Sequence, residues 1–162
     1  MPKTKKQKVE AKSENRVYSV NRKAFHDYEI LERYEAGVVL TGTEIKSIRS
    51  GRAELREAYA KAEKGELWLV NAHIAAYDPA SIYNHEPRRS RKLLLHREEI
   101  KKLTSTVAEK GLTIVALRLY IKNHVAKIEV GLARGKRQYD KRRAMIDREM
   151  DMAARRAVRA AR

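Results

Sequence analysis

The side chains of this chain that could carry chemistry are mainly lysines and arginines, gathered in three short segments. One of them, at residues 88–92, reads Arg-Arg-Ser-Arg-Lys and follows a stretch with two prolines. Another, at residues 21–28, interleaves basic side chains with an asparagine, a phenylalanine and a tyrosine. The last, at residues 135–143, lies near the C-terminus. Lysine and arginine neutralise phosphates and aromatic rings stack on unpaired bases, so these segments predict binding to RNA.

We expect the asparagine, lysine and arginine side chains of the first two segments to contact RNA directly. They are Asn21, Arg22, Lys23, Arg88, Arg89, Arg91 and Lys92. Each segment also has a simpler interpretation, because most runs of charge are solvated surface and Phe25 and Tyr28 could equally lie in the core. Lys127 has the same two interpretations, since it lies on the polar face of a predicted strand and could either reach a phosphate or simply face solvent.

The remaining titratable residues argue against an enzyme. The five histidines are scattered without the spacing of a metal site, and the chain has no G-x-S-x-G, P-loop or G-x-G-x-x-G motif. Glu98 and Glu99 are adjacent rather than facing, which suits the start of a helix better than a general acid and base. The absence of cysteine excludes disulfides and thiolate ligands. We therefore expect no catalytic residue, no metal site and no cofactor.

The net charge points to a polyanionic partner. The chain has 37 lysines and arginines against 21 aspartates and glutamates, which leaves +16 on 162 residues. This charge is densest at the two ends of the chain. No apolar run is long enough to span a membrane, and the N-terminal segment lacks the apolar stretch of a signal peptide. We expect a cytoplasmic monomer that does not bind membranes.

The hydrophobic periodicity predicts short antiparallel strands with helices inserted among them. Branched or alternating apolar residues indicate strands at 28–34, 38–40, 58–63, 67–70, 113–122 and 125–133. Thr43 as a cap and Gly51 as a stop indicate a short helix, and a longer one is indicated between His96 and Gly111. The order lacks the alternation of strand and helix that a parallel sheet needs. The predicted fold is therefore mainly β, a small closed or nearly closed antiparallel barrel with two or three helices.

Three regions follow from this pattern. Residues 1–16 are basic with almost no large apolar side chain, and we expect them to be a disordered leader. Residues 17–134 form the barrel, and within it residues 77–92 have no period and predict a long loop. Residues 135–162 form a basic tail whose helical stripe of alanine and methionine is thin. We expect this tail to be disordered alone and to become helical against a partner.

Four motifs in the same order resemble the small protein B (SmpB) family, the tmRNA-binding proteins of bacterial trans-translation. The resemblance runs from about residue 21 to residue 143. The motifs are Asn-Arg-Lys-Ala at 21–24 with His26 and Tyr28, Tyr-Glu-Ala-Gly at 34–37 with the segment 42–49, Arg-Lys-Leu-Leu-Leu-His at 91–96, and Gly-Lys-Arg at 135–137 with Asp-Lys-Arg at 140–142.

The resemblance implies an oligonucleotide-binding type of barrel that binds the tRNA-like domain of tmRNA, also called SsrA RNA. Such a protein escorts tmRNA to ribosomes stalled without a sense codon in the A site. By similarity, Glu35, Gly37, Leu93, His96 and Lys127 fall on or near the face that holds tmRNA. A carboxylate has no attraction to phosphate, so Glu35 would accept from a base, a 2′-hydroxyl or a cation. Its alternative role is internal, as the partner of an arginine.

The same resemblance assigns the tail to the ribosome, where it would read the empty decoding centre and the mRNA channel of the small subunit. The tail residues concerned are Gly135, Lys136, Arg137, Tyr139, Asp140, Lys141 and Arg142. His96 and Tyr139 stand where some members of the family have asparagine and histidine. The main alternative is a small basic ribosomal protein. A nuclease or RNA-modifying enzyme would need a carboxylate cluster or a metal.

Overall fold

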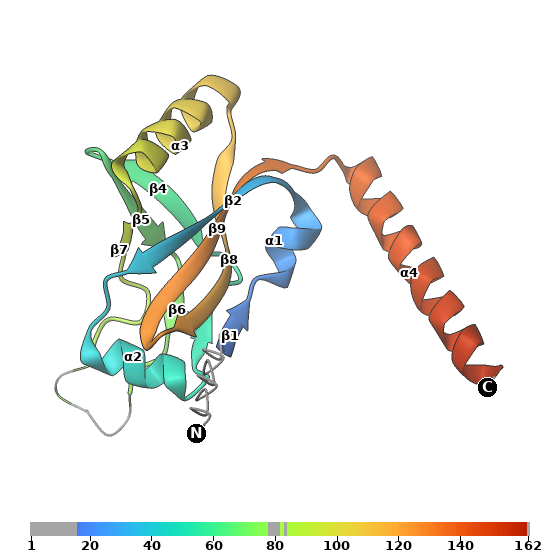
Figure 1. Cartoon of the computed structure of the whole chain (residues 1–162), viewed down its shortest axis with the longest axis horizontal. Coiled ribbons are helices and arrows are strands. Elements are labelled where there is room, and N and C mark those ends of the chain that lie inside the picture. Colours follow the sequence, from blue (N-terminus) through green and yellow to red (C-terminus); the bar gives the residue numbers. More distant parts are fainter. Residues whose placement is uncertain (1–15, 78–81, 83, 162) are drawn as a thin grey trace, which may run out of the picture.

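The computed structural model describes residues 16–77, 82 and 84–161, which form a ring of strands and one long helix that projects away from it (Figure 1). Most strands belong to one antiparallel sheet in the order β1-β8-β4-β5-β7-β2-β9, and β8 also pairs with β9, so that the ring nearly closes. These strands are β1 (Arg16–Val20), β2 (Tyr28–Val38), β4 (Tyr59–Glu63), β5 (Glu66–Val70), β7 (Arg91–Leu94), β8 (Thr113–Lys122) and β9 (Val125–Gly135). The predicted mainly β fold with inserted helices is confirmed.

The longest pairings join β2 to β9 and β9 to β8, and these three strands form one continuous wall. The ring closes through much shorter pairings, since β2 meets β7 only at Gly37↔Leu94 and Val38↔Leu93. A separate small sheet joins β3 (Ala53–Glu54) to β6 (His73–Ile74). Aliphatic side chains that alternate along the strands fill the interior, among them Leu67, Leu93, Ile128 and Val130.

Strand β2 differs from the prediction, which divided it at Gly37. It runs without a break from Tyr28 to Val38, and Gly37 lies inside it. A Cβ at Gly37 would lie 3.3 Å from the Cβ of Leu94, so the glycine allows β7 to pass closely rather than turning the chain. The two predicted hairpins are confirmed. Their tight turns use positive φ angles at Lys64 and Gly65 and at Asn123 and His124.

Two of the helices lie where the periodicity placed them. Helix α3 (Arg97–Lys110) begins after His96, whose N–H donates to Glu99, and ends at Gly111 with a positive φ of 61°. Helix α2 (Gly42–Arg49) begins after Thr41 rather than Thr43, because the carboxylate of Glu44 accepts a hydrogen bond from the Thr41 N–H at 2.9 Å. Both helices pack on the ring, through Ile48 and Leu103.

Helix α1 (Arg22–Asp27) was not among the helices located in the sequence, but with α2 and α3 it gives the barrel three helices, within the predicted two or three, and the fourth described helix belongs to the tail. Six residues are too few for a helical period to be visible in the sequence. Asn21 caps α1, since its side chain accepts from the N–H of Ala24 at 3.1 Å and donates to the carbonyl of Ala116 at 2.9 Å. The helix is therefore specified by a tertiary hydrogen bond to β8 as much as by its own residues.

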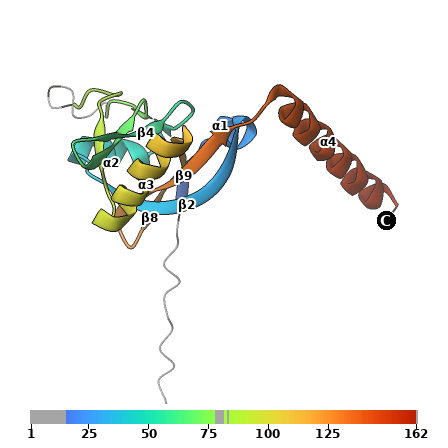
Figure 2. The same ribbon diagram turned by 90° about the horizontal axis from the view of Figure 1, so that it is seen from above.

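The tail forms helix α4 (Gln138–Ala160), which stands apart from the ring in both views (Figures 1 and 2). This differs from the disorder that we expected for a tail without a partner. Its alanines, arginines, glutamate and methionines have high helix propensity, which explains the conformation. Its large apolar side chains remain exposed, including Met145, Ile146, Met150 and Val158. Residues 1–15 of the predicted leader lie outside the described residues, and Arg16 already belongs to β1.

Candidate RNA interface

The outer face of the wall formed by β2, β9 and β8 carries a row of charged side chains. Because side chains alternate along a strand, residues paired across strands point to the same side. The pairings Gly37↔Lys127 and Tyr120↔Lys127 place these residues side by side on it. We call this surface the outer face, and it consists of Arg33, Glu35, Gly37, Leu94, Arg118, Tyr120, Lys122, Lys127 and Glu129.

Glu35 is the centre of this surface. Lys127 Nζ lies 3.4 Å from one of its carboxylate oxygens and Lys122 Nζ lies 3.6 Å from the other. The hydroxyl of Tyr120 donates to the same carboxylate. This hydrogen bond, followed by the two lysine charges, lowers the pKa of Glu35, and burial together with the same bond raises the pKa of Tyr120. The alternative internal role of Glu35 is therefore present, with two lysines and a tyrosine in place of an arginine.

A second group lies beside the first. Glu129 is flanked by Arg33 at 3.3 Å and by Arg118 at 3.9 Å. Both guanidinium groups also lie over the ring of Phe25, at 5.5 and 5.7 Å from its centroid. The outer face thus combines four cationic side chains with two carboxylates that hold them in place.

Sequence reasoning found only part of this surface. It named Glu35, Gly37 and Lys127, which the structure brings together, but it missed four cationic or aromatic neighbours. They are Arg33, Arg118, Tyr120 and Lys122. The signal was available for three of them, because Arg118, Tyr120 and Lys122 alternate with the apolar residues that had identified β8.

The structure contradicts the position expected for Leu93. Leu93 pairs with Val38 and its side chain is buried in the core, whereas Leu94 pairs with Gly37 and is 52% exposed on the outer face. A shift of one residue along a strand moves a side chain to the opposite face, so three consecutive leucines give no indication of which one points outward. His96 is exposed and lies at the start of α3.

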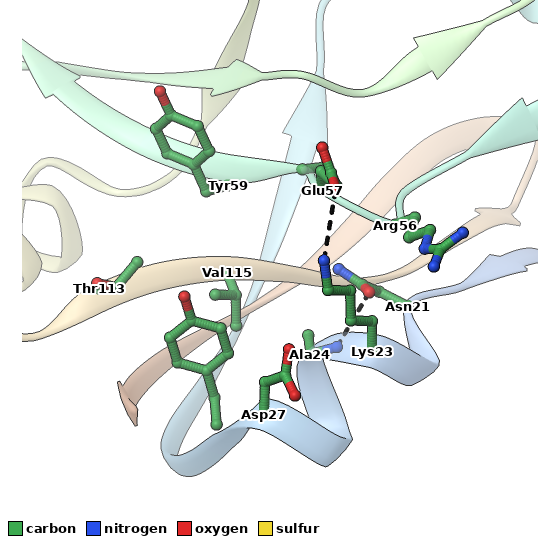
Figure 3. A pocket seen from close by; sticks show the side chains of 11 residues that line it. Asn21, Lys23, Ala24, Asp27, Arg56, Glu57, Tyr59, Thr113 and Val115 are labelled. Carbon is green, nitrogen blue, oxygen red and sulfur yellow. Dashed lines mark hydrogen bonds and ion pairs between the residues drawn. The ribbon is translucent and has the colours of Figure 1, made fainter. Parts of the chain in front are cut away.

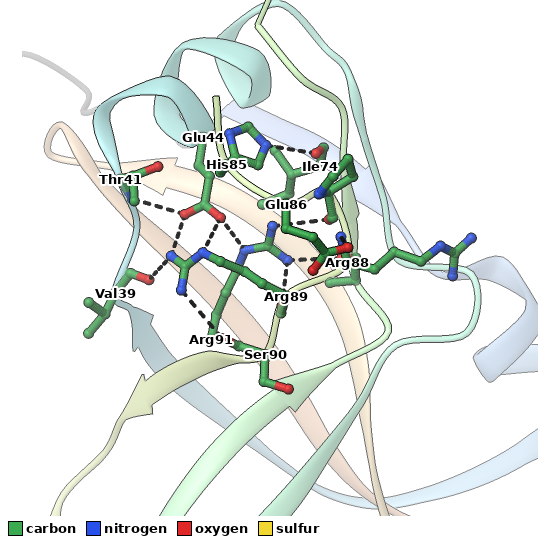
Figure 4. A network of polar contacts seen from close by, with 12 residues as sticks. Val39, Thr41, Glu44, Ile74, His85, Glu86, Arg88, Arg89, Ser90 and Arg91 are labelled. Atoms are coloured by element: carbon green, nitrogen blue, oxygen red, sulfur yellow. Dashed lines mark hydrogen bonds and ion pairs between the residues drawn. The ribbon is translucent and has the colours of Figure 1, made fainter. Parts of the chain in front are cut away.

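The basic segment 88–92 is largely an internal structure rather than a free basic loop (Figure 4). Arg91 is fully buried, and its Nε donates to the Glu44 carboxylate at 2.8 Å. Arg89 donates to the same carboxylate from Nε at 2.7 Å and from Nη2 at 2.6 Å. The other nitrogens of Arg91 donate to the carbonyls of Ala72, Pro87 and Arg89. Full burial leaves the Arg91 side chain no access to RNA phosphates, which corrects its expected contact, whereas Arg89 is 32% exposed and its contact with RNA stays a prediction.

The Glu44 carboxylate remains charged in this position. Burial raises its pKa, but the hydrogen bonds from Arg89 and from the Thr41 N–H, together with the charge of Arg91, lower it further than burial raises it. Of the other residues in the segment, Arg88 is exposed, and Lys92 lies 2.6 Å from Glu66 with both side chains partly exposed. Only these two cations of the segment can meet a ligand with little rearrangement.

The basic segment at residues 21–28 also contains both internal and accessible side chains. Asn21 is 2% exposed and serves as the cap of α1, which corrects its expected contact with RNA. Arg22 and Lys23 are exposed. Lys23 lies 3.3 Å from Glu57, and their ion pair spans a pocket of about 420 Å³ between α1 and the strands (Figure 3). Phe25 and Tyr28 are half-buried against Val115, Leu117 and Ala133, so the core interpretation holds for part of each ring.

The predicted tail residues continue directly from β9. Gly135 pairs with Tyr28, and the N–H of Lys136 donates to the carbonyl of Asp27 at 2.9 Å. Arg137 occupies the N-cap position of α4 without a capping hydrogen bond from its side chain, and Asp140 and Arg142 are exposed in the first turns of the helix. The side chain of Tyr139 lies outside the part that the structure describes.

Two further features bear on the class of protein. Within the ranges that the structure describes, no three histidine, aspartate or glutamate side chains gather closely enough to hold a metal ion. No described helix is both long and apolar enough to cross a membrane.

Comparison with known proteins identifies the family. The model of the SmpB protein family matches residues 18–160. The SsrA-binding protein of Carboxydothermus hydrogenoformans is 54% identical over 145 residues, which is 90% of this chain and 97% of that protein. The SsrA-binding protein of Geobacillus kaustophilus is 55% identical over 148 residues, which is 91% of this chain and 96% of that protein.

A solved structure agrees with these relatives. A chain of the structure described as "tmRNA-SmpB: a journey to the center of the bacterial ribosome" superposes with a TM-score of 0.63 at 49% identity, covering 78% of this chain and 92% of that one. The resemblance read from the motifs is confirmed, and the chain belongs to the SmpB family.

Proposed function

We propose that this chain is an SsrA-binding protein that binds the tRNA-like domain of tmRNA and delivers it to stalled ribosomes for trans-translation in the cytoplasm. Family membership and the SsrA-binding proteins that it matches over nine tenths of its length support this function. One structural observation supports separate parts for binding tmRNA and the ribosome. The packed ring has a charged outer face, and a separate basic helix leaves the ring.

The outer face suits a folded RNA rather than a specific base sequence. Lys122, Lys127 and Arg118 present their cationic groups on one side of the wall at fixed spacing. Glu35 cannot bind phosphate, and its role is to orient the two lysines or to accept from a 2′-hydroxyl. Arg22, Lys23, Arg88, Lys92 and His96 are accessible and remain candidates for contacts around this face.

The tail has the charge and the exposed helix expected of a segment that binds the ribosome. Gly135, Lys136, Arg137, Tyr139, Asp140, Lys141 and Arg142 are the residues that we assign to the decoding centre and the mRNA channel. A helix whose apolar side chains stay exposed has little tertiary packing, and isolated helices are marginal in water. Ribosomal RNA phosphates around its arginines would stabilise the part of α4 beyond its first turns, so this part is expected to be more persistent on the ribosome than in the free protein.

Removal of two outer-face cations tests the RNA-binding role. In the Lys122→Gln/Lys127→Gln variant, tmRNA affinity should fall about tenfold at physiological salt, because two phosphate contacts are lost. The slope of log K against log salt concentration should become shallower by about 2, one for each lost contact. Fluorescence anisotropy of labelled tmRNA at several salt concentrations measures both quantities.

The matched control is Lys61→Gln/Lys101→Gln, which removes the same charge from exposed positions on β4 and α3. It should change the affinity less than about twofold, because neither lysine belongs to the outer face and salt screens interactions between separated exposed charges. If the control weakens binding as much as the outer-face variant does, the RNA is held by general charge and the proposed interface is wrong.

A further inference from the structure

The first residues of the tail are hydrogen-bonded to the last turn of α1. The N–H of Lys136 donates to the carbonyl of Asp27 at 2.9 Å, and the Nζ of Lys136 donates to the carbonyl of Phe25 at 3.4 Å. One turn into α4, Lys141 Nζ lies 3.7 Å from the carboxylate of Asp27. Asp27 therefore meets the tail twice, through its backbone just before α4 and through its side chain within α4.

Neighbouring groups orient the carboxylate of Asp27 and favour its charged form. His26 Nδ1 lies 2.8 Å from the same Oδ1 atom that faces Lys141, so the neighbouring ring orients the carboxylate. The hydrogen bond from His26, and then the charges of Lys141, His26 and Lys23, lower the pKa of Asp27 despite its partial burial. The side chains of Asp27 and Lys141 are 26% and 32% exposed, so their ion pair is better shielded from solvent than most surface pairs.

A helix that is held at one point can rotate about it, whereas contacts at two points fix the direction of the helix. The pairing of Gly135 with Tyr28 and the Lys136 hydrogen bond hold the base of the tail, but rotation about the following backbone would still let α4 swing. The contact between Lys141 and Asp27 supplies the second point. A helix of 23 residues is about 35 Å long, so a tilt of about 10° at its base moves its far end by about 6 Å.

We propose that Asp27 is a positioning residue, which holds Lys141 and so sets the direction in which α4 leaves the ring. The neighbouring pair of Glu29 and Arg134 does not do this, because Arg134 precedes the tail and both side chains are more than half exposed. The consequence for trans-translation rests on the proposed function of the tail, whereas the orientation itself does not.

The absence of cysteine allows the orientation to be measured directly in the full chain. Spin labels can be attached at Ser105→Cys on α3, which packs on the ring, and at Met145→Cys near the base of α4. Both positions are exposed. Pulsed electron resonance then gives the distribution of distances between them. We expect a narrow distribution in the otherwise unchanged chain, and a clearly broader one in Asp27→Asn and in Lys141→Gln.

Two variants separate the ion pair from other effects. Asp147→Asn removes the same charge from an exposed site of α4, and should leave the distribution narrow. The exchange Asp27→Lys/Lys141→Asp restores an ion pair of opposite sense, and should narrow the distribution again. A distribution that is broad in the unchanged chain, that stays narrow in Asp27→Asn, or that the exchange fails to narrow would overturn the proposal.

The functional readout distinguishes this inference from the proposed function. Asp27→Asn should reduce peptide tagging on stalled ribosomes about threefold to fivefold, in line with the loss of one partly shielded ion pair, and leave tmRNA affinity unchanged. Tagging at the unchanged level with a broadened distance distribution would overturn the functional consequence alone. Loss of tmRNA affinity in Asp27→Asn would instead contradict the assignment of RNA binding to the outer face.

Discussion

A chain that ends at Arg137 should bind tmRNA with an affinity within about threefold of the full chain, yet tag no peptides on stalled ribosomes. The truncated chain retains all of β9 and the hydrogen bond from Lys136 to Asp27, so the ring and its outer face stay intact. The removed charges lie on a helix that stands apart from the ring in both views, so their loss should affect binding at the outer face little (Figures 1 and 2). Under the proposed function, tagging requires the tail to enter the ribosome, which the shortened chain cannot do.

The experiment measures tmRNA binding in solution and peptide tagging in a reconstituted translation system with an mRNA that lacks a stop codon. A chain whose residues 138–162 carry the same amino acids in scrambled order serves as the control for charge and length. We expect it to bind tmRNA normally and to tag poorly. Equal loss of both activities on truncation would contradict the assignment of the two partners to separate parts of the molecule.

Glu44→Gln should lower the free energy of unfolding by about 3 kcal/mol, the lower end of the cost of removing one partner from a buried ion pair. Arg91 is fully buried and would keep its charge with only carbonyl partners around it. Arg89 is partly exposed and can turn towards water, which limits the loss. Chemical denaturation followed by circular dichroism gives the value.

Glu66→Gln is a matched control, because it removes the same charge from a pair whose atoms are as close. The carboxylate of Glu66 lies 2.6 Å from Lys92, but both side chains are about two fifths exposed. Surface pairs of this kind contribute less than about 1 kcal/mol. If the two variants lose the same stability, burial of the Glu44 network is not what makes it strong.

The pH dependence of stability should follow the same carboxylate. The pKa of Glu44 in the folded protein lies below its ordinary value of 4.5, because its hydrogen bonds and the arginine charges outweigh burial. Its stabilising contribution is therefore fully present above pH 4.5, and is lost as the pH falls through the lowered pKa of the folded state. Thermal melts between pH 7 and pH 3 should show a steeper fall for the unchanged chain than for Glu44→Gln. Parallel curves would show that other carboxylates dominate the acid response.

Much about this protein was readable from the order of its residues alone. The alternation of β8 and β9, the tight turn at Asn123, the helix between His96 and Gly111, and the basic tail follow from local rules that act within a few residues. The motifs identified the family, and the comparisons confirmed it. The sequence also determined that the ends carry a dense positive charge, and hence that the partner is a polyanion.

Only the tertiary structure decided which of the basic residues are free to meet that partner. Arg89 and Arg91 look like Arg88 in the sequence, but Glu44, more than forty residues away, binds both, and Arg91 is fully buried. The register of β7 against β2 places Leu94 rather than Leu93 on the outer face. The carbonyl of Ala116 on β8 accepts a hydrogen bond from Asn21 and so holds it as the cap of α1. In each case the deciding contact joins residues far apart in the chain, and neither charge nor periodicity records where such a partner will lie.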